Sequence, residues 1–429
     1  MHSFNLRPRC GLKALVFAWA LMQTAALLAG NVVTINSNNV LVINGKEVFP
    51  IGFTLGPPPG AKTPNGKEGL RELADAGTTF IRTGANSTNW SEETIANEQK
   101  WEDAASRCGM YCWVYLHERA SIRKRDSERE AMLRRVVNQF KDHPGMGIWK
   151  GADEPEWGKL KTKPLVNARE IIRELDPNHP LATIEAPRGT VSSLRPYNAT
   201  CDITGCDITG CDIYPISYPP GKHSLLTNKE INMVGDYTRT MMEVTESKMP
   251  VWMVLQIAWS GVAKKGKTLR FPTFPEERFM TYEAIINGAR GLVYFGGNVK
   301  QTLSPEDAAL GWNWTFWNHV LRPVVEEIGT HSPLAPALIA PDSKLPVTVS
   351  EPNDIEFCVR EVGGEIFLLA CKRAGATAEV EFDKLPVADG TYELMYESPR
   401  SVKVSNGKFK DWFAPYEVHV YRLKRSRSS

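Results

Sequence analysis

The 429-residue chain carries 51 lysines and arginines against 49 aspartates and glutamates, a formal net charge of +2, and 42% of its residues are hydrophobic. This length exceeds that of one ordinary domain and fits a large barrel with a smaller module. Because charges of both signs are interspersed, the composition excludes the overall electrostatic footprint of a protein that binds nucleic acid or an anionic membrane surface.

The first 30 residues have the pattern of a secretory signal peptide. Arg7, Arg9 and Lys13 precede an apolar run over 14–28 that is too short for a typical membrane span. Small residues at the end of this run are candidate cleavage positions, with the mature chain beginning near Asn31; the alternative is an uncleaved anchor. We therefore expect a secreted or periplasmic protein with no stable membrane span after removal of residues 1–30.

Residues 31–47 alternate apolar and polar side chains around Asn44-Gly45, which predicts a β-hairpin that closes the floor of a barrel. Short β-branched and aromatic runs, most of them followed by a helical pattern, then recur over 48–332. They predict a parallel sheet, and their number is the one that closes a (β/α)8 TIM barrel. The expected strands are 48–55, 78–83, 111–117, 147–152, 181–185, 207–214, 251–257 and 291–295. The expected helices are 66–76, 92–107, 128–141, 164–175, 228–247 and 276–287, with a last helical stretch at 312–328.

Four prolines mark residues 333–346 as a linker. Strand-like patterns separated by turn residues follow over 347–424 and predict an antiparallel β-sandwich. Because no cluster of aromatic residues accompanies these strands, we expect the sandwich to brace the barrel.

Cysteine usage predicts no disulfide scaffold and no zinc site. Cys10 lies in the signal segment, so seven cysteines remain and at least one thiol is unpaired. Their spacings do not include the Cys-x-x-Cys pair that is typical of zinc ligands. The sequence also has no phosphate-cradling glycine loop and no metal-ligand cluster, so we expect neither a cofactor nor a metal.

Two motifs resemble those of clan A glycoside hydrolases, the barrel family of cellulases and β-galactosidases. Residues 42–53 are similar to the entry into the family's first strand, and Asp153-Glu154-Pro155 at the expected end of the fourth strand resembles the family's Asn-Glu-Pro. The resemblance covers the order of elements over about 40–330. It implies an oligo- or polysaccharide substrate and makes Glu154 the general acid, with Asp153 in place of the asparagine.

Chemistry favours the same assignment, because two adjacent carboxylates repel and one of them should have the raised pKa that a general acid needs. The same tripeptide also fits an ordinary helix start, with an aspartate cap and a proline in the first turn.

The other candidate residues lie at strand ends, where parallel β/α folds place their chemistry. Asp212 and Glu185 are candidates for a second catalytic carboxylate, while Tyr214 resembles the family's aromatic support of the nucleophile and Arg82 its rim arginine. The remaining candidates for substrate contact are His117, Glu118, Trp157, Gln256 and Trp259. A structural alternative stands beside these roles: ion pairs for the charged groups and packing for the aromatic ones.

Gln256 is a departure from the family. The resemblance places the catalytic nucleophile, a glutamate, at the end of the seventh strand, and an amide cannot form a glycosyl ester. Three hypotheses follow: a hydrolase whose second carboxylate is Asp212 or Glu185; a hexosaminidase-like enzyme in which the substrate's acetamido group attacks while Asp153 and Glu154 assist; or a non-catalytic sugar-binding barrel.

Overall fold

The computed structural model describes residues 30–85, 89–198, 206–216, 226–258, 270–397 and 399–426. The predicted signal segment, apart from residue 30, and Trp259 lie outside the described residues.

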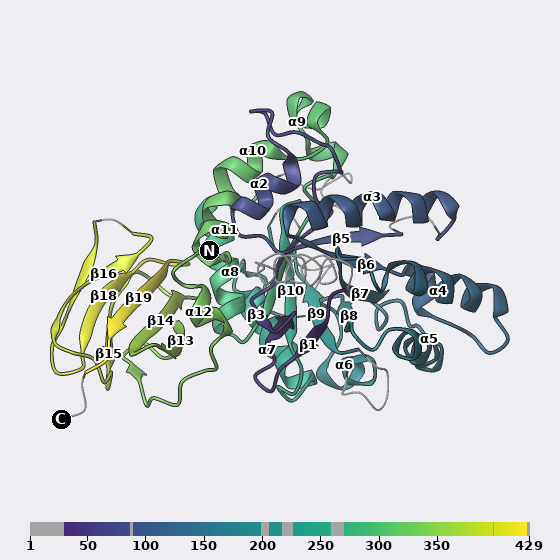
Figure 1. Ribbon diagram of the computed structural model, residues 1–429. Coiled ribbons are helices and arrows are strands. Elements are labelled where there is room, and N and C mark those ends of the chain that lie inside the picture. Colours follow the sequence, from purple (N-terminus) through teal and green to yellow (C-terminus); the bar gives the residue numbers. More distant parts are fainter. Residues whose placement is uncertain are drawn as a thin grey trace, which may run out of the picture.

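Eight parallel strands close into a barrel, as predicted, with helices packed around its outside (Figure 1). Neighbouring strands follow the order β10-β11-β4-β5-β6-β7-β8-β9. The strands are β4 Ile51–Thr54, β5 Phe80–Gly84, β6 Tyr111–Tyr115, β7 Met146–Asp153, β8 Leu181–Glu185, β9 Ile208–Asp212, β10 Val251–Gln256 and β11 Gly291–Phe295.

The helices between the strands follow the predicted segments closely, and α6 adds one that the sequence pattern did not indicate. Helix α3 shows how local sequence sets such boundaries, since the Ser91 side chain accepts a hydrogen bond from the Thr94 N–H and Gly109 ends the helix in a left-handed conformation. The helices of the barrel are α2 Gly69–Asp75, α3 Glu92–Cys108, α4 Ser127–Phe140, α5 Thr162–Leu175, α6 Val191–Asn198, α7 Met233–Val244, α8 Phe274–Ile286, α9 Pro305–Leu310, α10 Trp314–Phe316 and α11 Arg322–Ile328.

Three antiparallel strands, β1 Val33–Ile35, β2 Leu41–Ile43 and β3 Lys46–Val48, form a small sheet where we expected a two-stranded hairpin. Asn44 and Gly45 make the turn between β2 and β3 with positive φ angles. Inward side chains of β1 and β2 pack against barrel-interior residues such as Trp113 and Trp252. The sheet therefore closes the end of the barrel at which the parallel strands begin.

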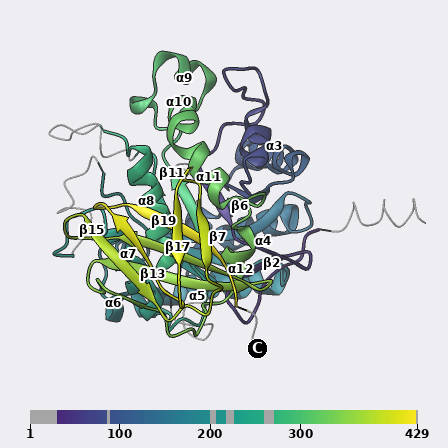
Figure 2. The ribbon, with the colours of Figure 1, turned by 90° about the vertical axis from the view of Figure 1, so that its left-hand side faces the viewer.

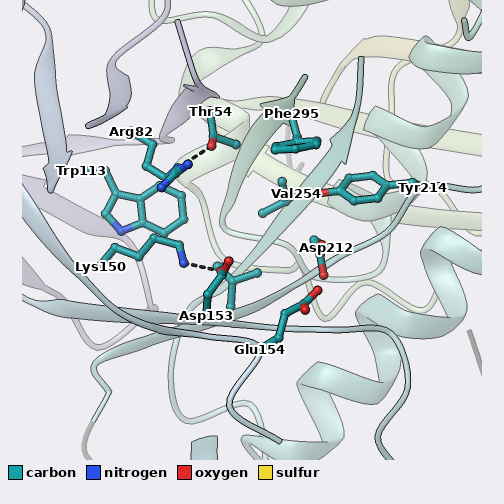
Figure 3. A pocket seen from close by; sticks show the side chains of 11 residues that line it. Thr54, Arg82, Trp113, Lys150, Asp153, Glu154, Asp212, Tyr214, Val254 and Phe295 are labelled. Atoms are coloured by element: carbon teal, nitrogen blue, oxygen red, sulfur yellow. Dashed lines mark hydrogen bonds and ion pairs between the residues drawn. The ribbon is translucent and has the colours of Figure 1, made fainter. Parts of the chain in front are cut away.

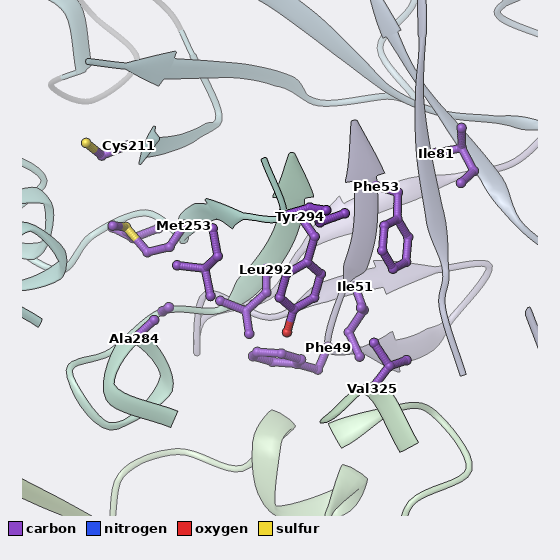
Figure 4. Close-up of a cluster of buried hydrophobic side chains, with 14 of the residues drawn as sticks. Phe49, Ile51, Phe53, Ile81, Cys211, Met253, Ala284, Leu292, Tyr294 and Val325 are labelled. Atoms are coloured by element: carbon purple, nitrogen blue, oxygen red, sulfur yellow. The ribbon is translucent and has the colours of Figure 1, made fainter. Parts of the chain in front are cut away.

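Large apolar side chains fill the space between the strands and the surrounding helices (Figure 4). Phe53, Tyr294 and Trp317 are fully buried there, and the ring centroids of Phe53 and Tyr294 lie 5.7 Å apart. None of the helices in the described ranges is both long enough and apolar enough to cross a bilayer.

Two antiparallel sheets form the C-terminal part of the chain, as predicted (Figure 2). One sheet has the order β13-β14-β19-β16-β17 and the other β12-β15-β18. A short helix, α12 Ala335–Ile339, occupies part of the stretch that the prolines predicted to be a plain linker. The strands are β12 Thr348–Val349, β13 Ile355–Val362, β14 Glu365–Lys372, β15 Ala378–Asp383, β16 Gly390–Met395, β17 Ser401–Val404, β18 Phe409–Phe413 and β19 Val418–Lys424.

One hydrophobic core joins the barrel to the sheets. Phe367, Leu369 and Val420 belong to the same buried cluster as the helices that cover β10 and β11. Polar contacts reinforce this junction: an Arg278 guanidinium nitrogen donates to the Val418 carbonyl at 2.7 Å, and Arg373 pairs with Asp236 at 2.7 Å.

Candidate active site

A cavity of about 200 Å³ opens at the end of the barrel where the parallel strands finish, opposite the β1–β3 sheet (Figure 3). Such strand ends carry the chemistry of (β/α)8 enzymes. Its walls combine three carboxyl groups, two cationic groups and several aromatic and apolar side chains. The lining residues are Thr54, Arg82, Trp113, Lys150, Asp153, Glu154, Ile184, Asp212, Tyr214, Val254 and Phe295.

Strand β7 supplies both Lys150 and Asp153 to this cavity. In a regular strand, residues three apart point to opposite faces. Between Lys150 and Asp153, however, the pairing of β7 with β8 shifts its register, so Lys150 lies opposite Ala182 and Asp153 opposite Ile184. This irregularity brings both side chains to one face, where the Lys150 ammonium donates a hydrogen bond to the Asp153 carboxylate.

The buried cations hold Asp153 in its ionised form. Burial by itself would raise the pKa of Asp153, but the charge and hydrogen bond of Lys150, together with the charge of Arg82, outweigh it and keep this pKa below its ordinary value. Lys150 is only 3% exposed, and its ammonium lies 4.1 Å from the centre of the Tyr115 ring. The Arg82 Nε donates to the Thr54 hydroxyl at 2.5 Å.

Glu154 has the opposite character to its neighbour. Its backbone is in the left-handed region, with φ of 45°, and its N–H donates to the Ile184 carbonyl at 2.8 Å. The Glu154 carboxyl group is hydrogen-bonded to that of Asp212, toward which it points in Figure 3. Burial and the negative charge of Asp153 raise the pKa of Glu154.

Asp212 lies against Glu154 and has a raised pKa as well. Burial, followed by the charges of Glu154 and Asp153, raises the pKa of Asp212 well above its ordinary value. Two carboxyl groups in contact lose their protons in two separate steps, and the second step is shifted to higher pH. Tyr214 hydrogen-bonds Asp212, and its ring stacks on Phe295 with 5.4 Å between centroids.

Trp157 stands on the loop that follows β7, with 46% of its surface exposed. The Arg188 guanidinium lies 3.8 Å from the centre of the Trp157 ring and covers one of its faces. The pair forms an exposed aromatic surface three residues along the chain from Glu154.

Two of the predicted residues lie outside the cavity because they are fully buried and have other partners. Glu185 accepts hydrogen bonds from the Glu156 backbone N–H at 3.1 Å and from the Asn198 side chain at 3.0 Å, and burial raises its pKa to about 7. Gln256 exchanges two hydrogen bonds with the backbone of Ile216, one of them 2.9 Å long. Glu185, a candidate for the second catalytic carboxylate, instead anchors the loop after β7. Gln256, a candidate for substrate contact, instead anchors the segment after β9.

The two residues predicted to contact substrate after the third barrel strand, β6, also have other positions. Glu118 is not among the residues that line the cavity and pairs with Arg129 at 3.3 Å, which agrees with the structural alternative. His117 packs its ring against Tyr115 at 5.4 Å between centroids and is absent from the cavity wall. Burial lowers the pKa of His117, which therefore carries no charge at neutral pH.

Lys150 is the charged cavity residue that the sequence interpretation missed. A lysine in the middle of an otherwise apolar strand is the signal that could have revealed it, because a buried charge requires a partner. The other lining residues that were missed are Thr54, Trp113, Ile184, Val254 and Phe295, and no sequence signal separates them from ordinary core residues.

A separate cluster under α3 offers potential metal ligands: Glu98, Glu102 and Cys112, whose ligand atoms lie within 4.8 Å of one another. Burial raises the pKa of Glu98 to about 8 and that of Glu102 to about 7. Glu98 accepts hydrogen bonds from the Thr83 hydroxyl and the Gly84 N–H, each at 2.6 Å. Protons can therefore neutralise this cluster, which ties α3 to β5, without a metal.

The cavity thus brings two carboxyl groups with raised pKa values beside one with a lowered pKa. When the surroundings raise the pKa of one carboxyl group and lower that of its neighbour, the first can act as an acid and the second as a base or a stabilising anion. The site can donate a proton from Glu154 and stabilise positive charge with Asp153.

Comparisons with known proteins identify the fold. No protein-family model matches the sequence, and no curated protein matches it. Among solved structures, the chain is similar to a glycoside hydrolase with a TM-score of 0.61 and 12% identity, over 93% of this chain and 98% of that one. It is similar to a family 5 glycoside hydrolase from Bacteroides vulgatus with a TM-score of 0.60 and 12% identity, over 93% and 94% of the chains.

A GH30 endoxylanase from Clostridium papyrosolvens is also similar, with a TM-score of 0.51 and 11% identity over 91% of this chain and 99% of that one. At these identities the likeness concerns the fold. The chain has the (β/α)8 glycoside hydrolase-like fold that its motifs resemble, and that resemblance is confirmed at the level of architecture.

Proposed function

We propose that this protein is a glycoside hydrolase that cleaves O-glycosidic bonds of an oligo- or polysaccharide, with Glu154 as the general acid. The observation that carries the proposal is the meeting of Glu154 and Asp212, whose pKa values are raised, with Asp153, whose pKa is lowered, in one cavity at the strand ends of the barrel. A glycosidase needs a protonated carboxyl group to donate to the leaving oxygen and an anion near the oxocarbenium-like transition state. The fold that the chain shares with glycoside hydrolases supports this chemistry.

In this mechanism Glu154 gives the proton of the pair to the glycosidic oxygen as the bond from that oxygen to the anomeric carbon breaks. A water molecule then adds to the anomeric carbon and returns a proton to the Glu154–Asp212 pair. Asp153, with its pKa depressed by Lys150, remains negative throughout and stabilises the positive charge that develops on the sugar. Trp157 offers one face of its indole ring to a neighbouring sugar, while Arg188 occupies the other face. Arg82 and Tyr214 fix the floor and the side of the cavity.

A substrate-assisted reaction is the second candidate, and the distribution of the carboxyl groups favours it. The three carboxyl groups of the cavity come from β7 and β9. The described lining residues from β10, β11 and β4 are Val254, Phe295 and Thr54, which include no carboxylate. A substrate acetamido group would then attack the sugar, with Asp153 to steady it and Glu154 to donate the proton.

The signal-like pattern at the N-terminus supports the further proposal that the protein acts outside the cytoplasm, secreted or periplasmic.

The test is release of reducing ends from a panel of polysaccharides and N-acetylated oligosaccharides. Glu154→Gln should reduce kcat by about 10²- to 10⁴-fold, the usual contribution of a general acid, while the surface control Glu118→Gln retains the wild-type rate. Unchanged turnover of a cleaved substrate by Glu154→Gln would remove Glu154 from the mechanism. Affinity for a glycan without any cleavage would identify a sugar-binding protein instead.

Azide separates the two catalytic candidates. If a carboxylate of the protein assists the attack of water on the sugar, azide should replace that water in Asp153→Ala or Asp212→Ala and form a glycosyl azide. If the acetamido group attacks, cleavage is restricted to N-acetylated substrates and neither variant forms the azide.

A further inference from the structure

A second concave surface lies on the same end of the barrel as the cavity. It is a groove of about 900 Å³ between the loop after β6 and the loop after β7 with the start of α5. We call it the basic groove because five of its nine lining residues are cationic and none is acidic. The lining residues are Ser121, Arg123, Lys124, Lys159, Leu160, Lys161, Lys163, Pro164 and Asn167.

Four of these cations have no neutralising partner. In the described ranges, Lys159 pairs with Glu156 at 2.5 Å, whereas no ion pair is formed by Arg123, Lys124, Lys161 or Lys163, which are all exposed. Two acidic groups near them in the sequence are already engaged, since Glu118 and Asp126 both pair with Arg129, and Glu128 is not among the lining residues of the groove. The groove is therefore a local concentration of positive charge on a chain whose net charge is only +2.

The walls of the groove are fixed to each other. The Ile122 N–H donates to the Pro164 carbonyl at 2.9 Å, and the Asn167 side chain donates to the Ile122 carbonyl at 2.9 Å. These bonds join the loop after β6 to helix α5. A preformed surface loses less conformational entropy when a ligand binds.

The groove and the cavity lie at the two ends of a single short loop. Gly158 donates its N–H to the Glu154 carbonyl at 2.8 Å, and Leu160 donates to the Pro155 carbonyl at 2.9 Å. The loop therefore folds back on itself, so that Glu154 faces the cavity at its start and Lys159 to Lys161 line the groove at its end, with exposed Trp157 between them.

We propose that the substrate is an anionic polysaccharide, whose carboxylate- or sulfate-bearing residues lie in the basic groove while a neighbouring glycosidic bond lies at Glu154. This inference rests on the proposed function, and it adds the class of substrate. Exposed cations contribute modestly one by one, but several acting on a polyanion produce strong, salt-dependent binding. The open face of Trp157, beside the acid and between the cavity and the groove, is where a sugar ring of this polysaccharide would stack.

The experiment measures binding of the full-length protein to three polymers with one backbone: dextran, carboxymethyl-dextran and dextran sulfate. The groove variant changes Arg123, Lys124, Lys161 and Lys163 to Gln. The matched control changes four exposed lysines elsewhere, Lys100, Lys344, Lys403 and Lys424, to Gln and alters the net charge equally. We expect a charged dextran to bind at least tenfold more tightly than dextran, and the groove variant to lose about tenfold of that affinity, while the control loses less than twofold.

The two charged polymers separate carboxylate from sulfate as the group that is recognised. Equal binding of neutral and charged dextran, equal losses in the two variants, or binding of a DNA duplex without binding of charged dextran would each overturn the inference. Failure of the proposed function looks different, because charged polymers would then bind at the groove but no anionic polysaccharide would be cleaved. Cleavage of neutral polysaccharides alone would leave the proposed function standing and reject the groove as the substrate site.

Discussion

Lys150 and Asp153 contact each other on the inner face of the barrel, although they lie three positions apart along one strand. The register shift of β7 between these residues makes the contact. Its electrostatic result is a depressed pKa for Asp153, while the adjacent Glu154 keeps a raised pKa. The opposite pKa shifts of these two neighbouring carboxyl groups therefore depend on one irregularity of the backbone and one buried lysine.

Lys150→Met should remove the charge that keeps Asp153 ionised. We expect the pKa of Asp153 to rise, so that the acidic limb of the pH–activity profile moves to higher pH and kcat near pH 5 falls by about tenfold or more. The profile of kcat against pH checks this. Lys248→Met, which disrupts only the surface pair with Glu246, serves as the control, and an unmoved acidic limb in Lys150→Met would show that Asp153 ionises without its partner.

Asp212→Asn should shift the alkaline limb of the pH–activity profile. The second carboxylate raises the pKa at which the shared proton leaves the Glu154–Asp212 pair, so its replacement by a neutral amide lets Glu154 lose the proton at lower pH. The alkaline limb of the profile is expected to move to lower pH, with the acidic limb in place. Asp75→Asn at the surface should leave both limbs unchanged, and an alkaline limb that moved upward would contradict the shared proton.

Gln256→Glu should not restore a nucleophile. A glutamic acid can copy both hydrogen bonds to Ile216 only while it is protonated, since its ionised form would place an oxygen against the Ile216 carbonyl. Burial raises the folded pKa above the unfolded value of about 4.3, so stability is kept at pH 4 and falls by up to about 1.4 kcal/mol per pH unit above it. Urea unfolding at pH 4 and pH 7 checks this, and a gain in hydrolysis would show that residue 256 reaches the sugar.

Glu102→Gln should weaken the pH dependence of the free energy of unfolding, whereas Gln256→Glu should strengthen it. In the wild type, the raised pKa values of Glu98, about 8, and Glu102, about 7, mean that the folded state holds protons that the unfolded state releases above about pH 4.3. Stability should therefore decrease as pH rises from 5 to 8. The amide removes one of these protons, and the difference in unfolding free energy between pH 5 and pH 8 should shrink by on the order of 1 kcal/mol. Glu92→Gln on the exposed start of the same helix provides the control, and an undiminished difference in Glu102→Gln would contradict the assignment.

The barrel could be predicted from the sequence because buried parallel strands leave a strong local signal. Runs of β-branched and aromatic residues alternate with helical periods, and these patterns do not depend on distant parts of the chain. Helix α6 lacks such a signal because it is short and contains Pro196, which disfavours a helix wherever only local sequence is considered. The prolines of the expected linker had the reverse effect, because Pro336 sits in the first turn of α12, where proline is tolerated.

The residues of the candidate site could be predicted only where their position at the end of a strand is enough to bring them into the cavity. Asp153, Glu154 and Asp212 meet because they end strands β7 and β9. Glu185 also ends a strand, but its partners come from a loop and from α6, and no local pattern reveals that those partners enclose it. The contribution of Lys150 depends on a register shift, which changes the face of a side chain without changing the sequence pattern.

The hydrophobic core that joins α8 to β14 and β19 has a consequence for engineering. Accessory modules that hang on flexible tethers can be exchanged between proteins, but here Phe367, Leu369 and Val420 are part of the packing that supports the barrel wall. A chain ending at residue 332 would leave this apolar surface of the wall uncovered and would aggregate. The C-terminal sheets are therefore a fixed part of the folding unit, and any shortened or chimeric form of the protein must retain them.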